Sequence, residues 1–332
     1  MAGQWAARAA IAEEAVRGRF VRRVFALPGT RLGLPRVGGR VHLRWNYWWQ
    51  AHLLDCLVDA RLREASEERE RVIAALVRGI RVRNFGVWTN SYYDDMAWLG
   101  LALQRAGGAE GALSAIEARL RSGWTEDLGG GIWWRRGDTF KNVPANGPAA
   151  IFLARRGDHE WARAALDWMD RTLVDPDTGL LWDGVYLGGE VVKTIYTYCQ
   201  GVFIGAATEL STSDLVARTV RAVKRYVATA HVLPGQGSGD GGLFAGILAR
   251  YLAQSALRLP DAEGDTARRL VFASAEAVWR HRVITQDGPL FGVEWGSASD
   301  PGVDLSVQLS AWMTLEAAAL LARVDGSAPD RV

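Results

Sequence analysis

Apolar residues recur at helical spacing along the whole chain, at intervals of about 25 residues, and this pattern restricts the fold more than any other feature. Several of the segments end at glycines that suit a helix C-terminus, such as Gly107, Gly123 and Gly157. No strands alternate with them, so the sequence predicts an all-α fold of about twelve helices. Six antiparallel helical hairpins can close into an (α/α)6 barrel, or toroid, although periodicity alone does not establish closure. The predicted helices span 4–16, 45–63, 67–80, 92–106, 110–121, 146–156, 159–173, 196–210, 213–231, 242–256, 264–280 and 304–323.

The organisation of the chain indicates a single domain over residues 1–332. Its 332 residues are 49% hydrophobic and 23% charged, enough to bury a large core, and no linker interrupts them. The first forty residues are basic, with seven arginines from Arg17 to Arg40. They form either a solvated face or a surface for an anionic lipid or polymer. We expect residues 325–332 to be a frayed tail.

Composition excludes several classes of function. The net charge of +2 disfavours nucleic acid as the main partner. Two distant cysteines, Cys56 and Cys199, cannot build a disulfide framework or a metal site, and the five histidines lack ligand spacing, so no metal or cofactor is expected. No stretch approaches the ~18 apolar residues of a membrane span. The N-terminus lacks the apolar run of a signal peptide. The expectation is a cytoplasmic monomer, with secretion left open because the sequence can be a trimmed one.

Three loops between the predicted helices are rich in glycine, tryptophan and aspartate. They span 126–142, 175–190 and 233–242, and the first reads as a short hairpin over one end of the helices. Loops on a rigid scaffold commonly carry function. The chain has 15 tryptophans, whose flat apolar rings can pack on the C–H faces of sugars as well as fill a core.

Two adjacent aspartates stand at the start of an apolar helix in NSYYDDMAWLGLAL, residues 90–103. One interpretation is capping, because Ser91 and Asp94 fit a capping box and acids in the first turn suit the helix dipole. The other is catalysis, because Asp95 is surplus to such a cap and the surroundings are aromatic. Paired carboxyls share protons, which provides an acid and a nucleophile for glycoside cleavage. Retaining glycosidases hold the two groups about 5–5.5 Å apart, a spacing that neighbours in a first helical turn can reach.

The doublet and the blocks around it resemble glycoside hydrolase family 76, the endo-α-1,6-mannanases. The resemblance implies an (α/α)6 barrel with a carbohydrate cleft, and retaining hydrolysis of α-1,6-linked mannose backbones. It implies Asp94 as the nucleophile and Asp95 as the general acid/base. One departure is Cys199, where family members commonly carry asparagine. The resembling blocks, in the family's order, are YWWQAHLLD (47–55), YYDDMAWLGLAL (92–103), GGGIWW (129–134), KNVPANGPAAIFLAR (141–155), YTYCQGVFIGAATEL (196–210), GLFAGILARYL (242–252) and VQLSAWMTLEA (307–317).

Candidate substrate-binding residues lie in the same blocks and loops. Several have a structural interpretation that stays open: Asn146 can cap a helix, while Gln50 and Gln200 can be satisfied within the protein. Asp183 can form a turn and Asp240 can belong to a plain loop and N-cap. Strand alternation sends one ring of the Trp133–Trp134 pair into the core. The full set is Trp48, Gln50, Tyr93, Trp133, Trp134, Asn142, Asn146, Asp183, Tyr198, Gln200 and Asp240.

The sequence therefore predicts a glycoside hydrolase that acts on α-mannan or mannooligosaccharides. A transglycosylase would use the same residues, with a sugar hydroxyl in place of water as acceptor. A non-catalytic carbohydrate-binding protein would not need both Asp94 and Asp95. An epimerase of similar fold is disfavoured, because such enzymes rely on histidines for proton transfer and the histidines here are few and scattered.

Overall fold

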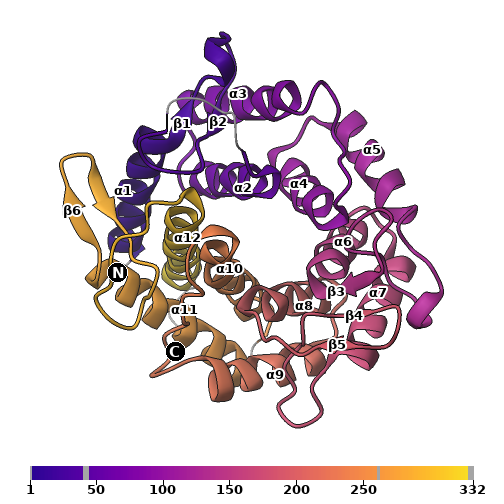
Figure 1. The fold of residues 1–332 in the computed structure, drawn as a ribbon. Helices are drawn as coiled ribbons and strands as arrows, with labels where there is room; N and C mark the ends of the chain where they lie inside the picture. Colours follow the sequence, from indigo (N-terminus) through magenta and orange to yellow (C-terminus); the bar gives the residue numbers. More distant parts are fainter. Residues whose placement is uncertain (1, 40–44, 260–261, 328–332) are drawn as a thin grey trace.

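The computed structural model describes residues 2–39, 45–259 and 262–327, and within these ranges it contains twelve α-helices (Figure 1). They begin and end close to the predicted segments. The helices are α1 (Ala2–Phe20), α2 (Tyr47–Arg63), α3 (Glu67–Arg83), α4 (Tyr93–Ala106), α5 (Glu110–Arg121), α6 (Val143–Arg155), α7 (His159–Leu173), α8 (Thr197–Glu209), α9 (Ser213–Ala222), α10 (Phe244–Ala256), α11 (Ala262–Arg280) and α12 (Leu305–Ser327).

The even-numbered helices form a closed inner ring. Each packs against the next, and α12 packs against α2 to complete the circle, with the odd-numbered helices outside (Figure 1). The inner helices are buried on most of their circumference: α8 buries 11 of its 13 residues, as expected for a helix with neighbours on several sides. The predicted (α/α)6 toroid is confirmed.

Glycines allow the inner helices to approach closely. A Cβ on Gly201 of α8 would lie 2.9 Å from the Leu248 Cα of α10. A Cβ on Gly246 of α10 would lie 2.6 Å from the Ser310 Cα of α12. Distances below 3.0 Å are too short for real Cβ atoms, so these helix pairs depend on the missing side chain.

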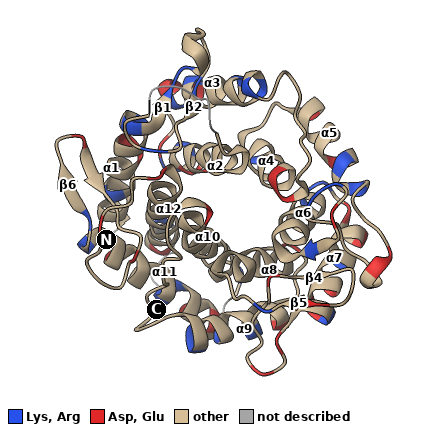
Figure 2. Cartoon of the chain, viewed as in Figure 1, with Lys and Arg blue, Asp and Glu red and all other residues tan. Residues whose placement is uncertain are grey.

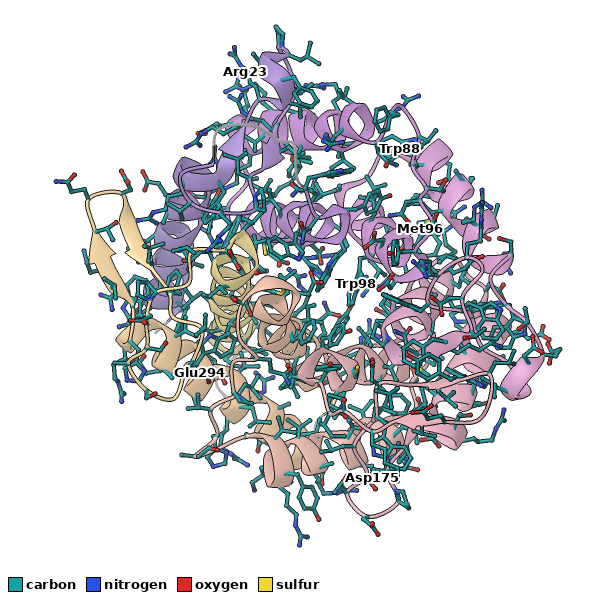
Figure 3. The ribbon with its side chains drawn as sticks, viewed as in Figure 1. Arg23, Trp88, Met96, Trp98, Asp175 and Glu294 are labelled. Carbon is teal, nitrogen blue, oxygen red and sulfur yellow. The ribbon has the colours of Figure 1, made fainter. Side chains whose placement is uncertain are left out.

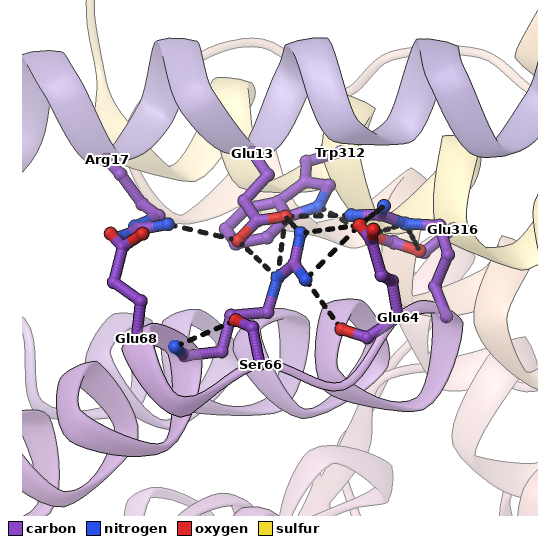
Figure 4. Close-up of polar contacts among 9 residues, drawn as sticks. Glu13, Arg17, Glu64, Ser66, Glu68, Trp312 and Glu316 are labelled. Atoms are coloured by element: carbon purple, nitrogen blue, oxygen red, sulfur yellow. Dashed lines mark hydrogen bonds and ion pairs between the residues drawn. The ribbon is translucent and has the colours of Figure 1, made fainter.

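A buried ion network joins the helices where the ring closes (Figure 4). Glu13 of α1 accepts hydrogen bonds from Arg63 of α2 at 2.7 Å and from Arg69 of α3 at 2.9 Å. Arg63 also contacts Glu316 of α12 at 3.1 Å, and Glu316 accepts from the Trp312 indole at 2.9 Å. The terminal helices are therefore tied to the first inner hairpin through paired charges.

A second buried network crosses the ring between α2, α4 and α10. Asp55 and Asp59 each pair with both Arg105 and Arg250. The two arginines lower the pKa of Asp55 to about 2, although burial alone would raise it. The two arginines are far from the two aspartates in the sequence, and no motif there indicates that the four side chains meet.

Short strands and turns connect the helices. The predicted 126–142 hairpin is only partly correct, because β3 pairs with β4 from the 175–190 loop and the local pairing is the single bridge Trp133–Lys141. The two loops thus share one antiparallel sheet, ordered β3-β4-β5. The strands are β1 (Val21–Arg22), β2 (Leu32–Gly33), β3 (Phe140–Asn142), β4 (Gly184–Tyr186), β5 (Val191–Val192), β6 (Val283–Thr285) and β7 (Gly288–Leu290). Shorter helical turns are η1 (Val24–Ala26), η2 (Asp127–Gly129), η3 (Val223–Val227, a π turn) and η4 (Gly239–Leu243).

Some helix ends differ from the prediction. Helix α6 begins at Val143 rather than 146, because Asn142 is its N-cap and accepts from the Ala145 N–H, while proline suits the first turn. Asn146 is therefore not the cap. Helix α9 ends at Ala222 and passes into the π turn η3. Helix α12 continues to Ser327, so the expected fraying is wrong for 325–327, and 328–332 lie outside the described residues.

One helix does reach the length and apolarity of a membrane span, contrary to the sequence expectation. The segment Leu305–Gly326 of α12 has a mean hydropathy of 1.3, and 89% of it is buried inside the ring. Its burial is that of a core helix.

Replacing Glu13 by glutamine should lower the free energy of unfolding by about 3 kcal/mol, because Arg63 and Arg69 would keep their charges without the buried carboxylate between them. Urea unfolding with an unchanged slope measures the loss. Glu14→Gln is the matched control, one residue along the same helix and exposed. A loss below about 1 kcal/mol for Glu13→Gln would show that ring closure does not depend on this network.

Candidate active site

A pocket of about 360 Å³ opens at the end of the ring where inner helices begin. The first turns of α2, α4, α8 and α10 contribute to it, and the β3-β4-β5 sheet forms another wall. The size falls within the range of about 300–1,000 Å³ that is usual for ligand pockets. Its lining residues are Trp48, Asp94, Trp98, Trp134, Phe140, Asn142, Asp183, Tyr186, Val192, Tyr196, Tyr198, Asp240 and Phe244.

Asp94 lies in the first turn of α4, and its carboxyl oxygens accept hydrogen bonds from two donors. Its Oδ1 accepts from the Asp95 backbone N–H at 2.8 Å, and its Oδ2 accepts from the Trp134 indole at 3.0 Å. Burial raises the pKa of Asp94 to about 7, against the opposing effect of these donors. The carboxyl therefore ionises near neutrality and is held in one orientation.

Asp95 has a different environment. Its Oδ2 accepts from the Asn90 side-chain amide at 2.6 Å. Burial, and then the neighbouring charge of Asp94, raise the pKa of Asp95 well above its ordinary value. Ser91 does not cap α4, which has Tyr92 at its N-cap position with no side-chain cap bond. The capping-box interpretation of the doublet is therefore wrong.

The ionisable side chains of the pocket include several aspartates. Asp240 accepts from the indoles of Trp48 and Trp49, at 3.1 and 2.8 Å. Asp183 faces the pocket from the loop before β4, and burial raises its pKa to about 6. No lysine or arginine is among the described lining residues. Such a pocket suits a neutral ligand with many hydroxyl donors and disfavours an anion.

Aromatic rings form most of the remaining wall. Trp98 lies near the centre of the ring (Figure 3), with its ring 6.4 Å from that of Trp48. Tyr198 stacks on Phe244 at 3.8 Å. Trp98 was missed by sequence reasoning, although it follows Asp94 by four residues and so lies one helical turn along the same face. The other lining residues that were missed are Phe140, Tyr186, Val192, Tyr196 and Phe244.

His52 lies directly behind this wall. Its ring is 4.7 Å from that of Trp98 and 5.4 Å from that of Trp48. Neither ring nitrogen has a hydrogen-bond partner among the described residues, and burial lowers its pKa to about 3. His52 is therefore a neutral support for the two tryptophans. No cluster of three or more metal-ligating side chains occurs in the described part of the chain.

Six of the eleven predicted substrate-binding residues do line the pocket, but three amides among the other five serve the fold instead. Each of these occupies the fourth position of an inner helix and binds both the N–H and the C=O of one loop residue, at 2.7–3.0 Å. Gln308 repeats the arrangement. For Gln50 and Gln200 the structure thus confirms the alternative of internal satisfaction, whereas Asn146 has an internal partner in place of both the substrate contact and the cap that the sequence suggested. The pairs are Gln50 with Gly33, Asn146 with Ile132, Gln200 with Leu181 and Gln308 with Phe291.

Tyr93 and Trp133 are also predicted site residues that do not line the pocket. Tyr93 is buried behind it, against Gly123. The Lys141 ammonium lies over the Trp133 ring, 4.5 Å from its centroid. Its neighbour Trp134 is the member of the pair that faces the pocket, as strand alternation requires.

Cys199 is buried beside Asp183. Its Sγ lies 4.0 Å from Asp183 Oδ1, the limit for a weak thiol hydrogen bond. The contact places the one departure from the expected family pattern directly behind a pocket carboxyl. An asparagine there would donate a stronger hydrogen bond than the thiol does.

Comparison with known proteins decides the family. The sequence pattern of glycosyl hydrolase family 76 matches residues 35–328. The chain belongs to glycoside hydrolase family 76. It is therefore a glycoside hydrolase, as predicted. Among curated proteins, none matches this chain closely enough to count as a relative.

Solved structures of family 76 are similar over nearly the whole chain. The α-1,6-mannanase GH76A from Salegentibacter sp. HEL1_6 is 34% identical with a TM-score of 0.86, over 96% of this chain and 99% of that one. The Lin0763 protein from Listeria innocua is 25% identical with a TM-score of 0.84, over 99% of both chains. A family 76 α-mannanase from Bacteroides thetaiotaomicron, 15% identical with a TM-score of 0.74 over 98% of both, shares the fold.

In this family 76 hydrolase, replacing Gln50 by leucine should lower the free energy of unfolding by about 3 kcal/mol, because the N–H and C=O of Gly33 would be buried without partners. KM for the glycoside should stay unchanged, because the amide does not reach the pocket. Gln104→Leu is the control, since that amide donates one bond, to the Phe152 C=O, and leaves its Oε1 unpartnered. A raised KM with unchanged stability would restore the substrate-binding role.

Proposed function

We propose that this family 76 hydrolase cleaves α-1,6-linked mannose backbones with retention of configuration. The observation that carries the proposal is the pair of buried carboxyls on the first turn of α4, with Asp94 in the wall of an aromatic pocket and Asp95 next to it in the sequence. The similar enzyme from Salegentibacter is an α-1,6-mannanase. A variant of it with two adjacent aspartates replaced by asparagine is inactive and is found in complex with α-1,6-mannotriose.

The hydrogen bonds favour different roles for the two aspartates. Two donors orient Asp94 and stabilise its anion, which suits a nucleophile. Asp95 accepts one such hydrogen bond, and burial together with the charge of Asp94 raises its pKa, so it keeps its proton as a general acid must. The same assignment follows from the family resemblance.

In the proposed first step, the Asp94 carboxylate forms a bond to the anomeric carbon while Asp95 gives its proton to the departing glycosidic oxygen. The products are a glycosyl ester on Asp94 and a shortened glycan. In the second step, Asp95 removes a proton from water, and the water oxygen displaces Asp94 from the anomeric carbon. Both residues return to their starting protonation states, and two inversions give net retention.

The rest of the pocket suits a mannoside. Asp183 and Asp240 can accept hydrogen bonds from sugar hydroxyls, and the Asn142 amide can both donate and accept. Trp48, Trp98 and Trp134 offer flat faces to the C–H bonds of the ring. The hydrogen bond from the Trp48 indole to Asp240 holds these two pocket side chains in fixed positions relative to each other.

Linear α-1,6-mannooligosaccharides test the reaction, with product length followed by chromatography and anomeric configuration by NMR. Hydrolysis with retention gives only shorter products whose new reducing end is first formed as the α-anomer. Products longer than the substrate would identify a transglycosylase, and an initial β-anomer would exclude the double displacement.

Asp94→Asn should reduce kcat by at least about 10³-fold, because the amide cannot form the glycosyl ester, while oligosaccharide binding measured by calorimetry persists. Asp177→Asn, in an exposed turn of the 175–190 loop, is the matched control and should leave kcat unchanged. Turnover by Asp94→Asn at the wild-type rate would contradict the proposed nucleophile.

The acid limb of the pH profile of kcat/KM should report the ionisation of Asp94. Because activity requires the anion, activity rises as pH passes upward through that pKa. Trp134→Phe removes a donor that stabilises the anion, so the limb should move to higher pH by about one unit. The control is Trp124→Phe, which removes an indole bond to Glu126 outside the pocket. A limb that stays in place or moves to lower pH in Trp134→Phe would contradict the assignment.

A further inference from the structure

Two arginine-rich stretches without acidic residues lie together on one face of the molecule. Residues 16–39 contain six arginines and residues 71–93 contain four, and neither stretch has an aspartate or a glutamate. The Arg31 backbone N–H donates to the Ala75 C=O at 2.9 Å, and the Arg78 guanidinium donates to the Gly29 C=O at 2.8 Å. Figure 2 shows the basic segments beside β1 and on α3.

The same stretches expose large apolar side chains. Phe85 is 89% exposed and Phe25 is 57% exposed, and the Arg83 guanidinium lies 6.0 Å from the Phe25 ring. Leu27, Val82 and Val87 are exposed as well. Apolar groups gathered in this way among cations mark an interaction surface rather than scattered exposure. We name this surface the basic apolar rim: Arg22, Arg23, Phe25, Leu27, Arg31, Arg78, Arg81, Val82, Arg83, Phe85 and Val87.

The backbone holds both exposed rings in place. Phe25 has a φ of 46° and Phe85 a φ of 55°, in the left-handed region that bulky residues rarely adopt. Such conformations cost of order 1 kcal/mol or more and persist where the surrounding structure requires them. The outward rings are therefore built into two loops and do not result from frayed chain ends.

The basic apolar rim lies at the active-site end of the toroid. The loop that follows α3 carries Phe85 and leads directly to the catalytic pair, nine residues later. Within this loop the Trp88 C=O accepts from the Tyr47 hydroxyl, and Asn90 donates to Asp95. Whatever binds the rim is therefore held next to the pocket.

Most of the acidic side chains near the rim form ion pairs with arginines. The groove between α1 and α3 is lined by six arginines together with Glu13, Glu14 and Glu68. Glu13 pairs with Arg63 and Arg69, and Glu68 pairs with Arg17. Arg23, labelled at the outer edge of the ring in Figure 3, and Arg31 form no ion pair within the described ranges. The face keeps a net positive charge.

We propose that the basic apolar rim docks on an anionic phospholipid bilayer. Phe25 and Phe85 would enter the headgroup region, and the arginines would pair with lipid phosphates. A soluble polyanion would use the arginines but not Leu27, Val82 and Val87, so the exposed apolar groups favour a lipid surface. If the proposed function holds, the pocket then faces mannan chains attached to a membrane.

Sedimentation with vesicles tests the docking without any carbohydrate. The 332-residue chain should bind vesicles of phosphatidylglycerol mixed with phosphatidylcholine, bind more weakly as salt rises, and not bind phosphatidylcholine alone. Absence of sedimentation, or equal sedimentation with both vesicles, would overturn the proposal. Because no glycoside is present, this result is independent of the proposed reaction.

Matched variants separate a lipid surface from a general polyanion site. Phe25→Ser with Phe85→Ser should weaken vesicle binding at least tenfold, while Ile284→Ser, equally apolar and 65% exposed on the β6–β7 hairpin, should not. Arg23→Gln with Arg31→Gln should weaken it about 30-fold, against no change for Arg163→Gln with Arg171→Gln on α7. Binding to heparin that matches vesicle binding and ignores the phenylalanine changes would identify a polyanion site and overturn the proposal. Hydrolysis of soluble mannooligosaccharides by the phenylalanine double variant should be unchanged.

Discussion

Closure of the inner helical ring is the constraint on which the rest of this structure depends. Once α12 packs against α2, every inner helix has an inner neighbour on both sides, and most of its side chains are buried. Glycines at the contacts set the distance between the helices. Because inner helices begin at the pocket end of the ring, their first turns and the loops before them meet there. The pocket is a consequence of that common direction, with each of several helices supplying one or two side chains.

Four side-chain amides connect this ring to its loops. Each amide stands at the fourth position of its helix and forms hydrogen bonds with both the N–H and the C=O of one residue in the preceding loop. These bonds fix the loop over the end of the ring. The aromatic and acidic groups of the pocket belong to these loops and to the helix starts that they cover. Rigid support of this kind is what a catalytic pair needs, since its geometry must be held within a fraction of an ångström.

Burial of the two carboxyls proposed for catalysis, at the start of α4, affects how stability depends on pH. The pKa of Asp94 is raised from 3.8 to about 7, so between these pH values the unfolded chain has lost a proton that the folded protein retains. The contribution of Asp94 to stability therefore falls as pH rises from about 4 to about 7, and Asp95 adds to the effect in the same direction. Catalytic sites are commonly maintained at such a cost, and here the ion networks at ring closure and around Asp55 supply compensating interactions.

The helical periodicity was enough to predict the twelve helices and the all-α fold class. Every helix of the inner or outer ring buries one or more faces, so its apolar residues recur at helical spacing. The Asp94–Asp95 doublet was also visible in sequence, since two charges before an apolar helix have few structural explanations. The sequence could not decide which polar groups meet. In the sequence Gln50 and Asn146 could each bind substrate or have a structural role, and only the fold reveals the residue within hydrogen-bond reach of each. It likewise could not bring Phe244 to Tyr198, or Phe25 to Arg83, because such partners are distant in sequence and proximity is a property of the packed chain.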